Sequence, residues 1–225
     1  MKKSIRVLMF AGLFVVLASF IWKSSTETNT SFNPQSENET ITIGNQVWMK
    51  RNLDVTTFSN GEAIIEAKTK EEWDRAGREG KPAWCYYENN PENGKKFGKL
   101  YNWYAVKSTK GLCPKGWHIP TDKEWSTMVD KIGGKDVAGK KIKTTSGWKA
   151  SGTNGDNSIG LSIVPGGYRD NETTFTNNGV TGYYWSSSEY LKVNAWSRTF
   201  TYNNDYAVRY VYYKEDGLSC RCVKD

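Results

Sequence analysis

The pattern of apolar and polar positions divides the chain of 225 residues into three stretches. Residues 1–22 open with a short basic segment and continue as a nearly unbroken apolar run from Val7 to Trp22. This order is typical of a secretory signal peptide. The run is 16 residues long, somewhat shorter than the roughly 20 residues that span a bilayer. The alternatives for residues 1–22 are therefore a cleaved signal peptide and an uncleaved membrane anchor.

The second stretch, residues 23–39, is polar and holds one large apolar side chain, Phe32. Such a composition buries too little apolar surface to fold, so it predicts a disordered tether. A single globular domain is expected over residues 40–225, because no later change in composition marks another boundary.

Local signals predict the first elements of this domain. Two short β-type runs, Thr40–Ile43 and Gln46–Met49, flank Gly44-Asn45 and predict a hairpin. Thr69 followed by Glu72 is a capping box that begins a short helix, which ends before Gly80.

A second helix is predicted after Thr121, which forms a capping box with Glu124. Its apolar residues recur at the spacing of one helical face: Trp125, Met128, Val129 and Ile132. We interpret this face as core packing, and the alternative is a ligand groove.

The C-terminal part has a different pattern, in which β-rich runs alternate with Asn, Gly and Asp turns. The predicted strands are Leu161–Val164, Tyr183–Ser186, Ala195–Thr201, Tyr206–Tyr213 and Leu218–Val223. Helices early and strands late predict an α+β fold. The 10 Trp, 13 Tyr and 8 Phe residues can supply a large core.

The charge balance argues against nucleic-acid binding. The formal net charge is +7, but Lys2, Lys3 and Arg6 of the leader supply three of these charges. Basic and acidic residues are interleaved in the rest of the chain, with no basic stripe.

Four cysteines are present: Cys85, Cys113, Cys220 and Cys222. An even count in an exported chain favours disulfides, but the sequence does not choose among the three connectivities. Cys220 and Cys222 fall on the same side of a predicted strand, so each should reach a different partner. A metal site is not predicted, because Cys-x-Cys is no zinc spacing and the chain has one His.

Several motifs in order resemble one family. They are Val47-Trp-Met-Lys-Arg-Asn-Leu53, Tyr101-Asn-Trp-Tyr-Ala105, Cys113-Pro-Lys-Gly-Trp-His-Ile-Pro-Thr-Asp122, Pro165-Gly-Gly-Tyr-Arg169, Tyr184-Trp-Ser-Ser-Ser188 and Arg221-Cys-Val223. The series resembles the Fibrobacter succinogenes major paralogous domain, found in exported and surface proteins of Bacteroidetes-type bacteria. The resemblance runs from about residue 41 to the C-terminus.

The resemblance implies an α+β, C-type-lectin-like fold, shared with formylglycine-generating enzymes. Such a fold has small twisted antiparallel sheets, two short helices and long irregular loops. The resemblance also implies that Cys113 pairs with Cys222, and we expect Cys85 and Cys220 to form a second pair. It supplies no catalytic residue or substrate.

No catalytic residue is predicted. Formylglycine-generating enzymes need a reactive cysteine pair, and Ser186–Ser188 stand in the corresponding stretch, where Ser cannot replace a thiolate. His118 is either a general base or, as we interpret it, a packed or capping side chain. Glu88, Glu92 and Asp156 could pair as glycosidase carboxylates, but the sequence does not set their separation.

The segment Tyr183–Tyr213 mixes aromatic residues with Ser, Asn and Arg, the residue types of binding surfaces. Some of these rings must belong to the core. The candidate ligand-binding residues are Tyr184, Trp185, Tyr190, Trp196, Tyr202, Asn203, Asn204 and Arg209. The expected ligand is a glycan or a protein.

No cofactor is expected, although a structural calcium ion is an option at Asp156 and Asn157 or near Asn203–Asp205. The loops of a calcium-dependent lectin, Glu-Pro-Asn or Gln-Pro-Asp, and its Trp-Asn-Asp run do not occur.

The sequence therefore predicts an exported, non-catalytic binding module of the bacterial cell envelope, surface or periplasm, which meets a membrane only through residues 7–22. The alternatives are an enzyme of unrecognised type acting on envelope polysaccharide, and a structural protein of the envelope.

Overall fold

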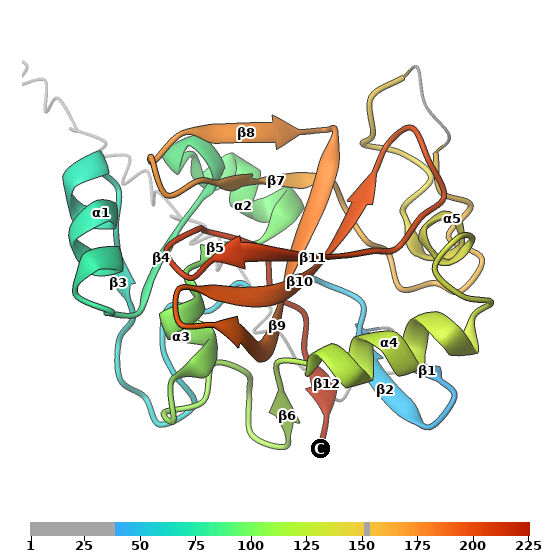
Figure 1. Cartoon of the computed structure of the whole chain (residues 1–225), viewed down its shortest axis with the longest axis horizontal. Helices are drawn as coiled ribbons and strands as arrows, with labels where there is room; N and C mark the ends of the chain where they lie inside the picture. The colour runs from blue at the N-terminus through green and yellow to red at the C-terminus, as the bar shows by residue number, and fades with distance from the viewer. Residues whose placement is uncertain (1–38, 151–153) are drawn as a thin grey trace, which may run out of the picture. The chain divides into compact units, whose positions relative to one another are not determined.

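A computed structural model describes residues 39–150 and 154–225 (Figure 1). The predicted signal or anchor and all of the predicted tether except residue 39 lie outside the described residues. Within the described ranges, every helix is too short or too polar to cross a bilayer.

The described chain has an α+β fold, as predicted, with small sheets and short helices. Its first sheet has the strand order β1-β2-β12-β6, formed by β1 (Thr40–Ile43), β2 (Gln46–Met49), β12 (Val223–Lys224) and β6 (Trp117–His118). A three-stranded sheet has the order β3-β4-β5, formed by β3 (Ile65–Glu66), β4 (Ala83–Cys85) and β5 (Leu100–Tyr101).

The largest sheet has five strands in the order β11-β10-β9-β7-β8. Its strands are β7 (Gly166–Arg169), β8 (Phe175–Asn178), β9 (Thr181–Leu191), β10 (Asn194–Thr201) and β11 (Val208–Tyr213). β11 is therefore an edge strand, and β9 lies in the middle. This arrangement decides which aromatic side chains reach the surface.

The predicted hairpin is confirmed, because β1 and β2 pair antiparallel with Ile43 opposite Gln46. Gly44, in the turn between them, has φ +62°, which an L side chain rarely adopts. Val223 of β12 pairs with both Trp48 and His118. The chain therefore returns at its C-terminus to join the hairpin to β6.

Both predicted helices are confirmed as α1 (Lys70–Arg78) and α4 (Asp122–Lys131), each with its capping box. The expectation of only two short helices was wrong. The described chain also contains a 3₁₀ helix and three more α-helices: η2 (Tyr87–Asn89), α2 (Pro91–Phe97), α3 (Trp103–Lys107) and α5 (Ala138–Ile142). These elements are too short to show an apolar period. Asn90 and Asn102 cap α2 and α3, respectively.

Two predicted strands are not formed as expected. Residues 161–164 contribute one isolated bridge, at Ile163, and of residues 218–223 only Val223 belongs to a strand. The physical reason is that residues 218–222 bond to several elements in turn. Their backbone carbonyls accept from Tyr101, Trp185, Leu53 and Met49. This segment therefore runs through the core as a connector.

The core lies on both sides of β9. On one side, Trp125 of α4 packs against Tyr184 and Phe200. On the other side, Trp103 and Trp185 belong to a second cluster. The buried indole N–H groups are satisfied, since Trp125 donates to the Trp185 carbonyl and Trp185 donates to that of Tyr101.

Two fully buried arginines connect loops to this core through backbone carbonyls. Arg221 donates to the carbonyls of Met49 and Leu161 at 2.9 and 2.8 Å. Arg169 donates to those of Ala67 and Thr69 at 2.9 and 3.0 Å. Both residues belong to the quoted motifs, so these motif positions stabilise the fold.

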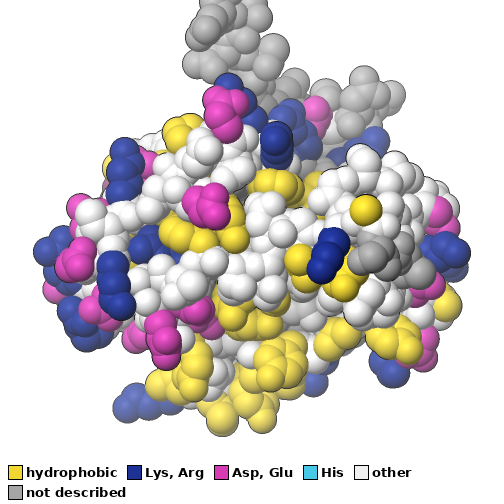
Figure 2. Space-filling model, turned by 90° about the horizontal axis from the view of Figure 1, so that it is seen from above, with side chains coloured by type: hydrophobic (Ala, Val, Ile, Leu, Met, Phe, Trp, Pro, Cys, Tyr) yellow, Lys and Arg dark blue, Asp and Glu magenta, His cyan; other side chains and the backbone are white. Residues whose placement is uncertain are grey.

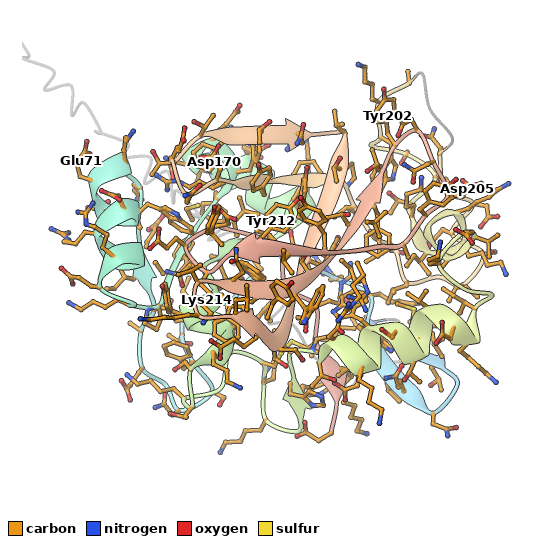
Figure 3. The ribbon with its side chains drawn as sticks, viewed as in Figure 1. Glu71, Asp170, Tyr202, Asp205, Tyr212 and Lys214 are labelled. Carbon is orange, nitrogen blue, oxygen red and sulfur yellow. A yellow bond between two sulfur atoms is a disulfide. The ribbon has the colours of Figure 1, made fainter. Side chains whose placement is uncertain are left out.

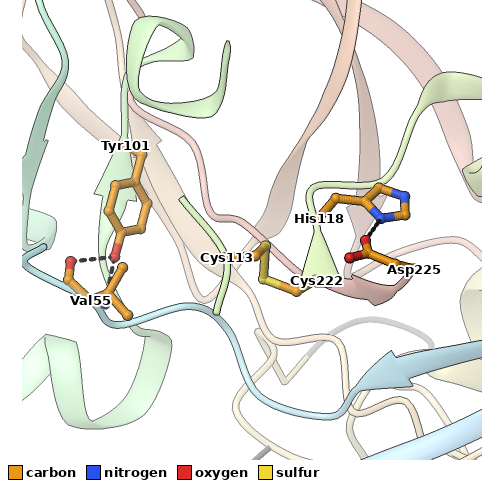
Figure 4. The surroundings of a disulfide bond; sticks show 6 residues. All are labelled: Val55, Tyr101, Cys113, His118, Cys222 and Asp225. Carbon is orange, nitrogen blue, oxygen red and sulfur yellow. Dashed lines mark hydrogen bonds and ion pairs between the residues drawn. A yellow bond between two sulfur atoms is a disulfide. The ribbon is translucent and has the colours of Figure 1, made fainter. Parts of the chain in front are cut away.

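Cys113 and Cys222 form the disulfide that the resemblance implied (Figure 4). The second expected pair is not formed, because Cys85 and Cys220 are free thiols. Both are fully buried, but they belong to different hydrophobic clusters. The disulfide is consistent with an extracellular or periplasmic location.

Candidate functional site

Exposed apolar side chains gather at one place on the domain. Of the nine large hydrophobic residues exposed among the described positions, seven lie on β11, just before it, or at the tip of the β9–β10 hairpin. We call these seven the aromatic strip: Tyr190, Leu191, Val193, Tyr206, Val208, Tyr210 and Tyr213. Figure 2 shows hydrophobic side chains gathered along its lower edge, the side on which β11 faces the reader in Figure 1.

The strip follows from the position of β11 at the edge of its sheet. β10 occupies one side of β11, and no strand of the described chain occupies the other. The sequence of β11, VRYVYY, contains neither Lys nor Pro, the residues that commonly protect an edge strand from pairing. Just before the strand, the Ala207 amide donates to the Lys135 carbonyl. The edge is thus covered at its beginning and open along the strand.

Trp196 supports this surface from within. The Tyr190 ring contacts it in an edge-on arrangement, with the ring centroids 4.6 Å apart. The guanidinium carbon of Arg209 lies 3.2 Å from the centre of the indole. Because both neighbours cover the ring, Trp196 holds Tyr190 and Arg209 in place.

Asp122, the first residue of α4, connects the helix to β10 and β11. Its carboxylate accepts from Arg198 at 2.6 Å and from the Nε of Arg209 at 2.9 Å. Burial would raise the pKa of Asp122, but the hydrogen bonds from Arg209 and Arg198 outweigh it and lower the pKa. The Ser188 hydroxyl accepts from the Asp122 amide, an N–H that the helix leaves unsatisfied.

A groove of about 780 Å³ lies between α4 and the first residues of β11. We call it the α4–β11 groove, and its lining residues are Ser126, Val129, Asp130, Lys135, Asp136, Arg198, Tyr206, Ala207, Val208 and Arg209. Arg198 is 2% exposed and its guanidinium donates to Ser126 Oγ at 2.8 Å. The groove adjoins the aromatic strip, since Tyr206 and Val208 belong to both.

The sequence model of the Fibrobacter succinogenes major domain family matches residues 41–224. The chain belongs to this family. No curated protein and no solved structure matches the chain. The matched residues include those of the strip and the groove.

The structure separates the predicted ligand-binding residues into three groups. Tyr184 and Trp185 are fully buried, so neither can contact a ligand at the surface. Tyr190, Trp196 and Arg209 lie together at the strip. The third group is the turn that holds Tyr202, Asn203 and Asn204. Figure 3 shows Asp205 beside α5 and Tyr202 above it, both away from Tyr212 and Lys214.

The 202–205 turn holds an ammonium group where a calcium ion was considered. Lys143 is fully buried, and its Nζ donates to the carbonyls of Thr201 and Asn204 at 2.9 and 2.7 Å. This positive charge opposes a calcium ion at the same oxygens. At the other considered position, the Asn157 side chain bonds both the amide and the hydroxyl of Ser162. The described ranges contain no group of three or more His, Cys, Asp or Glu side chains placed to hold a metal ion.

His118 is held by two carboxylates. Its Nδ1 lies 2.6 Å from Asp225 Oδ1 (Figure 4). Its Nε2 lies 2.9 Å from Glu124 Oε1. Burial lowers its pKa, but the hydrogen bonds with Asp225 and Glu124 raise it above the usual value. A protonated ring between two carboxylates fits the structural interpretation better than a general base.

The other residues weighed for catalysis lie elsewhere. Glu88 is on η2, Glu92 is in the first turn of α2, and Asp156 precedes a turn after α5. The α4–β11 groove is lined by none of them. Ser186 is buried, and its hydroxyl accepts from the Ser188 amide, so the serines help to position α4.

Sequence reasoning missed the groove residues Ser126, Asp130 and Tyr206. Ser126 and Asp130 are four residues apart on α4, and Val129 lies between them on the same side. The sequence signal for the helix side of the groove was this pair of polar residues at the border of the apolar helical face. The opposing wall could not be found, because it requires knowing that β11 lies beside α4.

Proposed function

We propose that this protein is an exported, non-catalytic binding module of the bacterial cell envelope or surface. Its ligand, a glycan or another protein, binds at the aromatic strip. The observation that carries the proposal is the gathering of seven of the nine large exposed hydrophobic residues, among those described, on one edge of one sheet. Contiguous exposed apolar surface of this kind commonly marks an interaction site.

Export is supported by the apolar leader in the sequence and by the disulfide between Cys113 and Cys222. Such bonds persist in oxidising compartments. We also propose that the fold is C-type-lectin-like. The disulfide supports this, because it joins the segment before α4 to the segment before the terminal strand β12.

The rigidity of the surface supports binding in preference to catalysis. Trp196, Arg209 and Asp122 hold one another in fixed geometry, which lowers the entropy lost when a ligand binds. The Asp122 carboxylate is already shared between Arg198 and Arg209, so it is not available as a base. A reaction would need a nucleophile or base with a free lone pair beside the ligand.

The test compares wild-type protein with a strip variant carrying Tyr190→Ser and Tyr210→Ser. Both proteins are applied to a glycan array and to solubilised cell envelope, and captured partners are identified by mass spectrometry. Ile65→Ser is the matched control, because Ile65 lies outside the strip. Its exposed fraction of 51% is close to the 56% of Tyr210.

Specific binding by the wild type and the Ile65→Ser control, with loss in the strip variant, is expected. Equal binding by the strip variant, or turnover of an envelope polysaccharide in place of stable binding, would reject the proposal. N-terminal sequencing of the protein recovered from each cell fraction checks its export separately.

A further inference from the structure

The two walls of the α4–β11 groove differ in chemistry. On the helix wall, Ser126 and Asp130 provide a hydroxyl and a carboxylate four residues apart. On the strand wall, Tyr206 and Val208 are 48% and 38% exposed and provide apolar surface. The groove therefore has a polar wall on α4 and a largely apolar wall at β11. Arg209, which also lines the groove, belongs to β11.

The polar groups of the groove are fixed before any ligand arrives. Arg209 donates to Asp122 through Nε and rests on the Trp196 ring. Arg198 is buried and donates to Asp122 and to Ser126 Oγ. A ligand that hydrogen-bonds to these groups does not have to order long flexible side chains, so its binding loses less entropy.

The charges around the groove balance. Lys135, Arg198 and Arg209 line it together with Asp130 and Asp136, and Asp122 is the carboxylate shared by the two arginines. Lys135 is paired with Asp136 at 3.0 Å. Three positive groups face three negative groups, so the groove offers no excess charge to a polyanion or a polycation. This balance favours a neutral ligand with many hydroxyl groups.

We propose that the α4–β11 groove is a subsite for a neutral glycan. A sugar ring presents a face of C–H bonds and an edge of hydroxyl groups, which match the two walls. The Tyr206 ring contacts the C–H face, the Asp130 carboxylate accepts from hydroxyl groups, and Arg209 donates to a ring or hydroxyl oxygen. The inference rests on the proposed function and gives its ligand a class.

An extended peptide fits the groove less well. Peptides commonly bind by adding a strand to free backbone groups at a sheet edge. The Ala207 amide, in the groove, already donates to the Lys135 carbonyl. The helix wall presents side chains only. A peptide would instead find free backbone along β11, outside the groove.

The experiment uses the full chain with its disulfide intact. Wild-type protein is first screened on an array of neutral and acidic oligosaccharides. The hexasaccharide with the strongest signal is then titrated by calorimetry into wild type, Tyr206→Ala and Asp130→Asn. Both residues are exposed, so the changes leave the core intact, and near-ultraviolet circular dichroism checks the fold. Ile65→Ala is the control outside both the groove and the strip, and Tyr210→Ala reports whether the bound sugar extends from the groove along the strip.

A neutral hexasaccharide is expected to bind, and Tyr206→Ala and Asp130→Asn should each weaken binding roughly tenfold, the effect of losing one main contact. Ile65→Ala should change the affinity by no more than about twofold, and Tyr210→Ala should weaken binding less than either groove variant does. Backbone amide shifts in α4 and the start of β11 should follow the titration.

Three results would overturn the assignment and leave different parts of the proposed function standing, and a fourth would reject both proposals. Neutral glycan binding that Tyr210→Ala abolishes and the groove variants retain would move the site to the strip. Binding of acidic glycans alone would contradict the charge balance. No glycan binding, with a protein partner captured through the strip, would leave a binding module whose ligand is not a carbohydrate, and silence in all assays would reject both proposals.

Discussion

The guanidinium carbon of Arg209 lies 3.2 Å from the centre of the Trp196 ring. The sequence predicted both residues as separate ligand contacts, but the structure uses each to hold the other. Trp196 covers one side of the guanidinium, and Asp122 fixes its Nε. A surface built in this way keeps its shape in the absence of a ligand, and its stability depends on the shared carboxylate.

Replacing that carboxylate should be costly. Asp122→Ala leaves the guanidinium of Arg198, which is 2% exposed, without its charge partner. An unpaired buried charge destabilises a fold by about 3–5 kcal/mol. Urea unfolding followed by Trp fluorescence measures the change. Asp130→Ala removes the same group from an exposed position on the same helix, and its effect should stay within about 0.5 kcal/mol. Equal losses in the two variants would contradict the role given to Asp122.

Asp216 should make the stability depend on pH. It lies in the turn after β11 and is 2% exposed. Burial raises its pKa to about 7, although hydrogen bonds from the Tyr213 and Asn171 amides lower it. An unfolded Asp has a pKa of about 3.9. As the pH rises, the unfolded chain therefore releases this proton before the native state does. The free energy of unfolding should fall as the pH rises from about 4 to about 7.

The variant Asp216→Asn removes this titration and keeps an oxygen for the Tyr213 amide. It should raise the free energy of unfolding at pH 8, by up to about 4 kcal/mol, and change it little near pH 4. Urea titrations at the two pH values measure the difference. A gain of equal size at both would show that ionisation of Asp216 plays no part.

Local signals predicted the local elements well. Thr121 and Glu124 marked the beginning of α4, and the apolar period through Trp125 identified its buried face. These signals depend only on residues within one or two turns, so no knowledge of the fold was needed. The family resemblance supplied the disulfide, which periodicity and spacing had left open.

Exposure of the aromatic residues could not be predicted in the same way. Tyr184 and Trp185 are neighbours on β9, and alternation would expose one of them. Both are buried because β9 is a central strand with a hydrophobic cluster on each face. Tyr190 belongs to the same strand but lies near its end, where these clusters no longer cover it. Strand order is a tertiary property that no local pattern contains.

Thiol titration should separate one disulfide from two. The native protein should not react with a thiol reagent, because Cys85 and Cys220 are buried and burial raises the pKa of both, that of Cys85 to about 12. Only thiolates react readily. Unfolding without a reductant should expose two thiols, and reduction should expose all four cysteines. No reaction in the denatured, unreduced protein would mean that Cys85 and Cys220 are bonded after all.

The disulfide itself should be a major source of stability. Its two cysteines are 109 positions apart, and closing so long a loop stabilises the native state by about 4–5 kcal/mol through the entropy of the unfolded chain. The double variant Cys113→Ser, Cys222→Ser should lose about this amount in urea unfolding. Adding a reductant to the wild type should have a similar effect and should change the double variant little, which separates loss of the bond from side effects of the substitutions.

Arg221 offers the sharpest test of why the family motif around it is needed. Its guanidinium is fully buried and donates to the carbonyls of Met49, Leu161 and Ser162 and to Asn52 Oδ1. Burial lowers its pKa, and no other side chain directs so many donors in a fixed plane.

Arg221→Met fills a similar volume but leaves these oxygens unsatisfied, and each buried acceptor that loses its partner costs about 1–3 kcal/mol. We therefore expect Arg221→Met to lower the free energy of unfolding by at least about 3 kcal/mol. Arg221→Lys should rescue little of this loss, because one ammonium group cannot reach acceptors on two separate segments. Full rescue by Lys would show that the positive charge matters and the planar geometry does not. Arg51→Met is the control, because Arg51 is exposed and lies between the acceptor residues Met49 and Asn52. It should change the stability by less than about 0.5 kcal/mol.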